Sequence, residues 1–223
     1  MLLQWSAPEY VPRSFLVSGV SGTNKAVKQT DTSFRLTKQV ADGLVDMQEV
    51  SKGLFLVQSE MAFKKETELC EEYPERKVFQ LSFCMNGICE WDYRQKRGEH
   101  YQLSPTQCSL QCGTFSQCVS RFGSEEPYRT LSISLEQERF LPLAEDLEAA
   151  HLIRRDNKIC THIFSTTPEI RLVLQQLLDC PPERKLRKLY LEGKVLELVS
   201  LFCEEAIGKQ KNDKEISRED YRC

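Results

Sequence analysis

The feature that most constrains what this chain can fold into is a helical pattern near its C-terminal end, at residues 187–203. At the ~100° per residue of an α-helix, one face carries a broad set of apolar side chains, namely Leu191, Val195, Leu198, Val199, Phe202 and Ala206. A second apolar stripe with heptad-like spacing lies beside this face. Because so wide an apolar arc needs two partners, we expect one part to cover the chain's own core and the other to contact a second copy.

The second stripe is the predicted dimer interface. Small residues beside its leucines favour a close approach of two helices. The residues assigned to this interface are Leu189, Gly193, Leu196, Ser200, Cys203 and Ile207. The alternative is an ordinary helix that the chain's own β domain and a neighbouring helix cover completely.

Length and charge limit the classes of function. The 223 residues fit one large domain or two small ones, and they can bury a substantial core without a metal ion or disulfide bonds. The 30 Lys and Arg residues and the 33 Asp and Glu residues give a formal charge of −3. This balance does not mark a nucleic-acid-binding surface, so we expect that the chain does not bind DNA by itself.

The cysteines and the N-terminal residues indicate the cellular compartment of the protein. The 10 cysteines lie mostly inside apolar strands and helices, as small buried hydrophobic residues do, which favours reduced thiols in a cytoplasmic protein. The first residues lack the basic start and the continuous apolar stretch of a signal peptide. Since no window approaches the ~20 apolar residues of a membrane-spanning helix, we expect a soluble protein with no membrane partner.

Short strands dominate the region that begins at Gly53. Residues 78–85 alternate between apolar and polar side chains, and residues 88–93 alternate again with Trp91 on the inward side. The dipeptide Asn86–Gly87 between these runs is a strong hairpin signal. Many short strands separated by frequent turns predict a β-sandwich or a β-barrel.

The pattern becomes helical from residue 141 onward. Thr167 and Pro168 mark a helix start, with the hydroxyl as the N-cap and proline at the first helical position. Residues 180–182 end this helix, and the long C-terminal helix follows after so short a connection that the two must pack antiparallel. The charged residues from Gly208 to Glu215 predict a linker, after which Ser217 is the N-cap of a further helix.

Four aromatic residues are the candidate ligand site. Phe79, Phe83, Trp91 and Tyr93 lie on neighbouring strands of the predicted hairpin, so they are expected to meet inside a barrel. Flat apolar walls with polar handles suit sugars, aromatic acids or amphipathic chelates. The alternative is that these side chains simply fill the core of the barrel.

The sequence gives little support for a catalytic site or a metal site. A metal-dependent enzyme with a small β-barrel usually needs several histidines and a carboxylate around its metal ion. His100, His151 and His162 are the only histidines, and no two of them have ligand spacing. The sequence also lacks a Cys-x-x-Cys pair, a nucleophile elbow and a Gly-rich phosphate loop. We therefore expect no catalytic residues, no metal site and no cofactor.

Three runs in the second half carry a family resemblance. They are residues 167–171 (TPEIR), 179–181 (DCP) and 189–198 (LYLEGKVLEL). Together with the strand-rich region before them, they resemble the N-terminal regulatory half of AraC-family transcription regulators, in the branch that includes the pyochelin and yersiniabactin siderophore regulators. The resemblance covers roughly residues 50–220.

The resemblance implies an α+β fold in which a cupin-like, jelly-roll-type antiparallel β-barrel precedes an antiparallel helical hairpin. Residues 1–50 are then an N-terminal arm or the first strands, 51–140 the barrel sensor, 141–207 the helical dimerisation region and 208–223 a linker. The linker leads toward a helix-turn-helix DNA-binding domain that is absent from this chain.

The expected function is effector sensing and dimerisation in a bacterial, cytoplasmic transcription regulator. The implied partners are a small-molecule effector, such as a siderophore or another amphipathic metabolite, and a second copy of the chain, with DNA bound only through the absent domain. Two alternatives stay open. They are a cupin-type metal-dependent enzyme and an oligomerisation module that binds no ligand.

Overall fold

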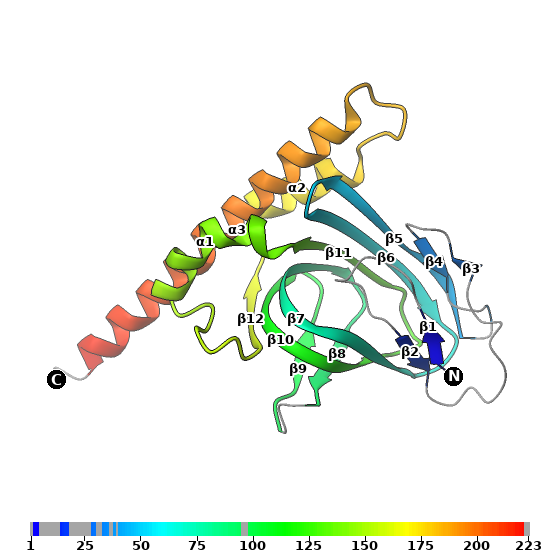
Figure 1. The fold of residues 1–223 in the computed structure, drawn as a ribbon, viewed down its shortest axis with the longest axis horizontal. Helices are drawn as coiled ribbons and strands as arrows, with labels where there is room; N and C mark the ends of the chain where they lie inside the picture. Colours follow the sequence, from blue (N-terminus) through cyan, green and yellow to red (C-terminus); the bar gives the residue numbers. More distant parts are fainter. Residues whose placement is uncertain are drawn as a thin grey trace.

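The computed structural model describes the backbone of residue 38, of residues 40–94 and 98–220, and of four short strands nearer the N-terminus (Figure 1). Side chains are described for residue 38 and for residues 40–70, 79–94 and 98–209. Those four strands are β1 (Leu2–Gln4), β2 (Ser14–Val17), β3 (Lys28–Gln29) and β4 (Ser33–Arg35). Apart from these strands and residue 38, positions 1–39 lie outside the described residues. The expected N-terminal arm therefore stays a prediction.

One large antiparallel sheet forms the body of the molecule. Its main strands are β5 (Ala41–Ser51), β6 (Leu54–Phe63), β7 (Thr67–Asn86), β8 (Cys89–Tyr93), β9 (Tyr101–Leu103), β10 (Gln107–Phe122), β11 (Tyr128–Leu135) and β12 (Cys160–Ser165). Their order is β5-β6-β11-β7-β10-β8-β9, and β12 also pairs with β10. The sheet curls, but among the described strands no pairing joins the two ends of this path.

The turn at Asn86–Gly87 does not make the predicted hairpin. Gly87 has a φ of +73°, a backbone conformation that glycine adopts readily in turns. However, β7 and β8 pair with β10 and not with each other, because β8 lies beyond the far edge of β10. Residues 118–122 of β10 therefore have β7 on one side and β8 on the other.

The helices confirm the predicted α+β class, a cupin-like antiparallel sheet followed by a helical hairpin. They are α1 (Gln137–Ala149), α2 (Pro168–Leu178) and α3 (Arg187–Asp220). Thr167 caps α2 as predicted, since its hydroxyl accepts a hydrogen bond from the Ile170 amide at 3.3 Å. The end of α2 meets the start of α3, where the Tyr190 hydroxyl donates to the Gln176 carbonyl at 3.4 Å, so the two helices are antiparallel.

The long helix continues where a break was predicted. The charged residues from Gly208 to Glu215 are helical, and α3 runs to Asp220 without a new start at Ser217. Charge alone does not end a helix, because Lys, Gln and Glu are strong helix formers and no proline intervenes. An ion pair between Lys209 and Glu205, at 3.0 Å and four residues apart, stabilises the turn where the charged region begins. The role of these residues as a linker stays a prediction.

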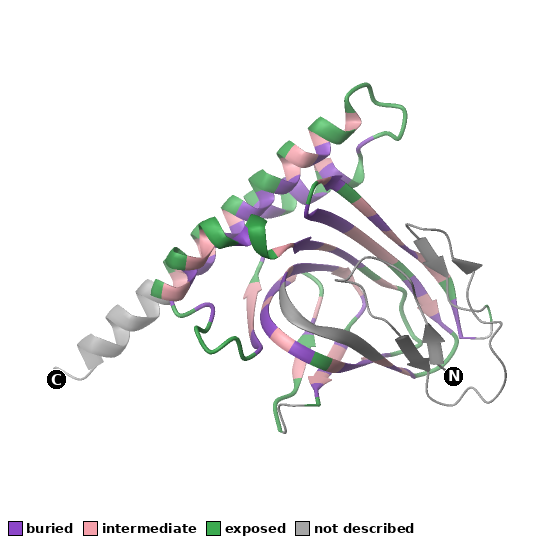
Figure 2. Cartoon of the chain, in the orientation of Figure 1, coloured by how far each residue is buried: buried purple, intermediate pink, exposed green. Residues whose placement is uncertain are grey.

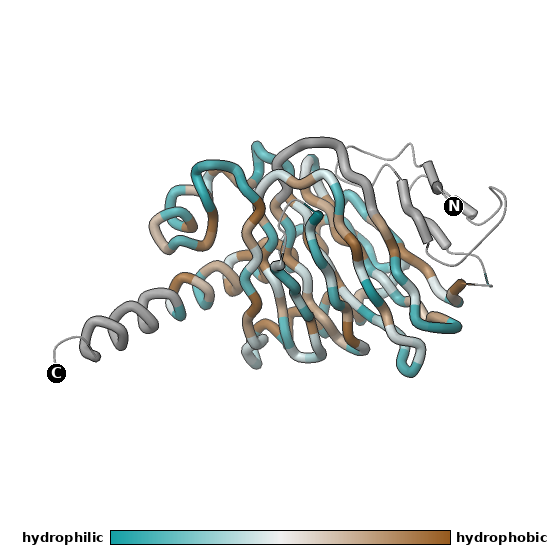
Figure 3. Tube along the Cα trace, turned by 90° about the horizontal axis from the view of Figure 1, so that it is seen from below, coloured by the Kyte–Doolittle hydropathy of each residue, from teal (hydrophilic) through white to brown (hydrophobic). Residues whose placement is uncertain are grey.

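Two hydrophobic cores occupy the two faces of the sheet. Figure 2 shows buried residues on the side of α3 that faces the sheet, and Figure 3 shows hydrophobic and hydrophilic residues alternating along the strands. The helix-facing core includes Phe79, Leu81, Phe83, Leu110, Ile133, Phe140, Leu191, Leu198 and Phe202. The inner core, on the face turned away from the helices, includes Met61, Phe63, Cys84, Trp91, Tyr93, Phe115, Cys118 and Phe122.

A β-bulge in β10 decides which face its side chains join. Before the bulge Cys108, Leu110 and Cys112 face the helices, so odd-numbered residues such as Phe115 face inward. The register shifts between Phe115 and Gln117, and after it the even-numbered Cys118 faces inward. The pairing skips residue 116 of β10 and residues 73–75 of β7, and across this irregularity the alternation along β10 reverses.

We expect Gly113→Ala to lower the free energy of unfolding by more than about 2 kcal/mol. Gly113 has a φ of +131°, and a Cβ atom there would lie 2.5 Å from the Lys158 carbonyl oxygen, which is backbone and cannot move aside cheaply. Urea unfolding followed by circular dichroism measures the change. Gly123→Ala is the matched control, because nothing lies within 4 Å of its Cβ position. Equal stability of the two variants would contradict the close packing at Gly113.

Candidate functional site

The candidate site is an aromatic cluster in the inner core, made of Trp91 and Tyr93 on β8, Tyr101 on β9 and Phe115 on β10. The Trp91 and Tyr101 rings are stacked, with centroids 5.6 Å apart and planes inclined by 22°. The Tyr93 ring lies 5.8 Å from Tyr101 and 4.9 Å from Phe115. Four rings from three strands thus form flat apolar walls.

Strand register explains why these rings meet. Trp91 pairs directly with Tyr101 across β8 and β9, and directly paired residues point to the same face. Tyr93 lies two residues after Trp91 and so shares its face. Phe115 joins them because it is the last inward-facing residue of β10 before the bulge.

Polar side chains line the same face of the neighbouring strands. The Tyr93 hydroxyl donates to Gln111 Oε1 at 2.8 Å, and Gln111 Nε2 donates to Ser109 Oγ at 3.5 Å. Further along the sheet, the Ser82 and Ser132 hydroxyls are hydrogen-bonded at 2.9 Å. These described side chains of the inner face are polar and uncharged, in contrast to the apolar helix-facing core.

Two polar atoms of this region are buried without a hydrogen-bond partner in the described part of the chain. They are Trp91 Nε1 and Thr161 Oγ1. Thr161 belongs to β12 and is paired with Gln111, so it lies on the inner face. A buried donor without an acceptor costs about 1–3 kcal/mol. The Tyr93 hydroxyl lies next to both side chains, and its oxygen can accept a hydrogen bond at looser geometry.

Trp91 Nε1 and Thr161 Oγ1 both lie near the Tyr93 hydroxyl. Burial raises the pKa of Tyr93 well above its usual value, while hydrogen bonds between its hydroxyl and the side chains of Thr161 and Trp91 lower it. Burial also raises the pKa of Tyr101, and its hydrogen bond to Glu99 adds to this effect. Both phenols are therefore neutral at physiological pH and act as hydrogen-bonding groups.

The charged residues of this region lie on the opposite face of β8. Arg121 contacts Asp92 at 2.5 Å and Glu68 at 3.3 Å, and His100 contacts Asp92 at 2.9 Å. Burial raises the pKa of Asp92, but the hydrogen bonds from Arg121 and His100 outweigh it and hold the pKa below its usual value. Because Asp92 alternates with Trp91 and Tyr93, this charge network faces away from the aromatic cluster.

The structure separates the four predicted ligand-binding residues. Trp91 and Tyr93 lie together in the inner core, as predicted. Phe79 and Phe83 lie in the helix-facing core instead, so the prediction that all four meet is wrong. Phe79 stacks on Phe140 of α1 at 5.2 Å, and Phe83 meets Phe202 of α3 at 6.2 Å. The cause is the pairing with β10, since Phe83 is paired with the helix-facing Cys108 and Tyr93 with the inward-facing Cys118.

Sequence reasoning missed Tyr101, Gln111 and Thr161. The alternation along residues 107–112 does indicate that Gln111 lies opposite the apolar Leu110. Nothing in the sequence indicates that β12 returns to β10 and brings Thr161 beside Gln111.

The histidines lie apart from this cluster. His162 stacks on Phe164 with ring centroids 6.2 Å apart, and it is paired with Leu110, whose side chain faces the helices. His100 belongs to the charge network on the opposite face of β8. Within the described ranges, no group of three or more His, Cys, Asp or Glu residues is placed to hold a metal ion.

Most of the predicted dimer stripe is exposed on α3. Leu189 is 65% exposed and Leu196 is 44% exposed, and Gly193 and Ser200 are exposed beside them. Ile207 is half-buried, and Cys203 is buried in the helix-facing core, so Cys203 does not extend the exposed stripe. Further exposed leucines lie on α2 at Leu172 and Leu178.

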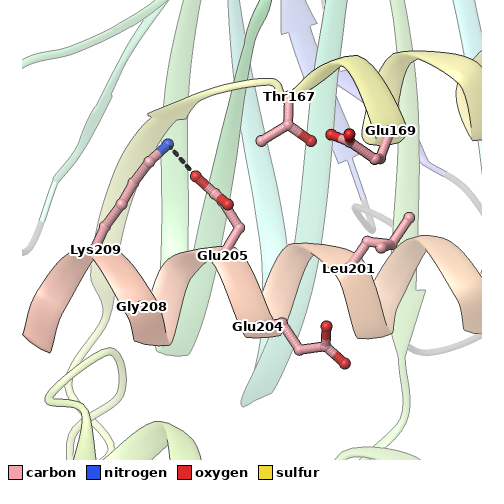
Figure 4. A pocket seen from close by; sticks show the side chains of 7 residues that line it. All are labelled: Thr167, Glu169, Leu201, Glu204, Glu205, Gly208 and Lys209. Atoms are coloured by element: carbon pink, nitrogen blue, oxygen red, sulfur yellow. Dashed lines mark ion pairs between the residues drawn. The ribbon is translucent and has the colours of Figure 1, made fainter.

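A groove of about 380 Å³ runs between α2 and α3 (Figure 4). It is lined by Thr167, Glu169, Leu201, Glu204, Glu205, Gly208 and Lys209. Figure 4 shows Glu205 and Lys209 directed toward α2 and Glu204 directed away from it. The groove contains none of the predicted ligand-binding residues, so it is separate from the aromatic cluster. In the part of the chain that the structure describes, no helix combines the length and the apolar character needed to cross a membrane.

Comparisons with known proteins agree with this architecture. The family model for the regulatory protein PchR N-terminal domain matches residues 42–217. The AraC-like transcriptional activator CuxR has a similar structure, with 9% identity, a TM-score of 0.51 and coverage of 83% of this chain and 61% of CuxR. An apo structure of ToxT from Vibrio cholerae has 11% identity, a TM-score of 0.50 and coverage of 74% and 59%.

At these identities the structural likeness shows the fold alone. The chain spans about three fifths of the length of the two solved structures. No curated protein sequence matches the chain.

We expect Tyr93→Phe to lower the free energy of unfolding by about 1–2 kcal/mol, because it leaves the Gln111 oxygen without its donor inside the sheet. Urea unfolding at pH 7 measures the change. Tyr101→Phe is the matched control, since its hydroxyl bonds the exposed Glu99 carboxylate, and we expect a loss below about 0.5 kcal/mol. A larger loss for Tyr101→Phe than for Tyr93→Phe would contradict the assignment of the buried hydrogen bond.

Proposed function

This chain belongs to the family of PchR regulatory protein N-terminal domains, which are N-terminal domains of AraC-family regulators, and on that basis we propose that it is an effector-sensing and dimerisation domain. Family membership carries the proposal. The effector is a small amphipathic metabolite, such as a siderophore, and it binds at the aromatic cluster. A helix-turn-helix domain C-terminal to such a module binds the DNA.

The aromatic cluster supports the effector site. Its rings provide apolar walls, and the Trp91 N–H and the Tyr93 and Thr161 hydroxyls provide polar groups beside them. A small molecule that binds here would combine contacts to the rings with hydrogen bonds to these polar groups. We therefore place Trp91 and Tyr93 in the effector site and leave out Phe79 and Phe83, whose rings pack on the helices.

The exposed stripe on α3 supports the dimer. Leu189 and Leu196 are large apolar side chains on a helix whose opposite face is already covered by the sheet. Gly193 and Ser200 leave room between them for the ridge of a second helix. A second copy of this chain is a self-complementary partner for such a stripe.

Contacts between the sheet and α3 can couple effector binding in the inner core to the position of the dimer helix α3. Strand β7 carries Cys84 in the inner core and Phe83 in the helix-facing core, where Phe83 meets Phe202 of α3. The start of α3 is joined to β5 by a hydrogen bond from Arg187 to Gln48 at 2.8 Å. An effector that binds two arrangements of these strands with different affinity would shift the position of α3.

We expect a cognate effector at 100 times its dissociation constant to stabilise the fold by about 2.7 kcal/mol, which corresponds to a rise of several degrees in the melting temperature. A thermal-shift screen of amphipathic metabolites, siderophores included, measures this rise. The Leu196→Glu variant should show the same rise, since its changed side chain lies outside the inner core.

If no compound in such a screen raises the melting temperature, the oligomerisation module without a ligand becomes the better interpretation. A stoichiometric transition metal in the purified protein would instead favour the metal-dependent enzyme.

We expect Leu196→Glu to convert dimers into monomers, because it places a charge in the middle of the exposed stripe. Analytical ultracentrifugation measures the change, and circular dichroism checks that the fold is kept. Ile88→Glu is the matched control, since Ile88 is 48% exposed but lies at the turn between β7 and β8. Dimers that persist in Leu196→Glu, or that dissociate equally in Ile88→Glu, would place the interface elsewhere.

A further inference from the structure

A basic surface with one exposed leucine lies at the tip of the α2–α3 hairpin (Figure 1), next to the stripe assigned to the dimer. It consists of residues 184–188 (RKLRK), which we call the α3 start. We propose that the α3 start is a docking surface for a segment of a partner protein that combines carboxylates with an apolar side chain. The inference goes beyond effector sensing and does not depend on it.

Positive charge is concentrated at the α3 start. Every residue of it except Leu186 is Arg or Lys, although the chain as a whole has a formal charge of −3. The N-terminus of a helix is already the positive end of the helix dipole, so basic side chains there are unfavourable. The first turns of α1 and α2 contain Glu138 and Glu169, whereas the first turn of α3, which the structure describes in full, contains no acidic residue. The arrangement therefore costs stability within the chain and suits an anionic partner.

The basic side chains of the α3 start have no counter-ion among the described residues. Lys209, elsewhere on α3, pairs with a carboxylate, but no ion pair of the described residues includes the α3 start. The Arg187 guanidinium donates instead to the neutral Gln48 amide oxygen at 2.8 Å, and its Nε atom is buried without a hydrogen-bond partner. Arg184 lies over the Tyr190 ring, 3.7 Å from its centroid. A carboxylate of a partner would thus meet cations that no described acid neutralises.

Leu186 gives the α3 start an apolar contact point. It is 77% exposed, more than any other large apolar residue in the part of the chain that the structure describes. Its φ of +57° lies in the left-handed region, which leucine adopts only at an energetic cost. Backbone strain and exposed apolar surface at the same residue are typical of a contact that a partner completes.

The same observations favour an acidic peptide segment over other partners. Nucleic acid phosphates match the charges but offer no apolar contact to Leu186. A lipid surface requires a broader apolar face than a single leucine provides. A second copy of the chain that meets this surface across a twofold axis would bring like charges together. A segment with carboxylates around one apolar side chain complements both the cations and Leu186.

Three fluorescently labelled peptides test this inference by anisotropy with the whole chain. The first peptide alternates pairs of glutamate and leucine residues, the second has glutamine in place of glutamate, and the third has serine in place of leucine. We expect the first peptide to bind saturably and the other two to bind at least about tenfold more weakly. Equal binding of the glutamine or the serine peptide overturns the inference, as does no binding of the first peptide at about 1 mM.

Variants of the chain locate the contact. Lys185→Glu with Lys188→Glu should weaken the acidic peptide at least about tenfold and should gain binding of a peptide that has lysine in place of glutamate. Lys38→Glu with Lys65→Glu is the matched control, because both lysines are exposed outside the helices and the charge change is equal. Leu186→Asn should weaken the acidic peptide several-fold without lowering the melting temperature, because asparagine tolerates a positive φ.

Three further results would contradict the inference. A charge-reversed variant that binds the acidic peptide as tightly as the unchanged chain places the contact elsewhere. If that variant loses its dimers in ultracentrifugation, a second copy occupies the α3 start, so this inference falls while the dimerisation proposal stands. Tighter binding of duplex DNA or of phosphatidylglycerol vesicles than of the peptide shows that the class of partner is wrong.

Discussion

The packing of α3 on the outer face of the curled sheet is the contact on which the rest of the structure depends. Phe202 lies between Phe83 of β7 and Phe164 of β12, with edge-on ring contacts to both. Leu191, Val195 and Leu198 extend the same buried row, each with no exposed surface. This row fixes the helix on the strands, and so it decides which side of α3 stays free for a partner and which face of the sheet stays free for a ligand.

The periodicity of α3 was predictable because it is a local property. The face with Leu191 and Val195 is buried as predicted, and the stripe with Leu189 and Leu196 is exposed. Cys203 differs, since the stripe gradually turns toward the sheet as the straight helix departs from a heptad repeat. The helix beyond Gly208 was missed because charged residues without apolar periodicity are compatible with both a linker and a helix.

The candidate site was only half predictable because strand order is not a local property. Alternation correctly placed Trp91 and Tyr93 on one face of β8. The step from strands adjacent in sequence to strands adjacent in space failed, because β10 inserts between β7 and β8. Thr161 illustrates the same limit, since its place beside Gln111 depends on a strand that follows the whole of α1 in the chain. Long-range pairing of this kind has no signature in any short window of sequence.

The bulge in β10 has a consequence for how this fold can change over time. Because the register shift after Phe115 assigns each later side chain to its face, the strand is more sensitive to its length than to its composition. Exchanging one apolar residue for another alters a single contact. Losing one residue here would turn Cys118 and Phe122 toward the outside and bring Arg121 inside. Relatives of this chain are therefore expected to vary in the kinds of side chain that line the sheet while they keep the spacing along β10, so that ligand preference diverges within a fixed frame.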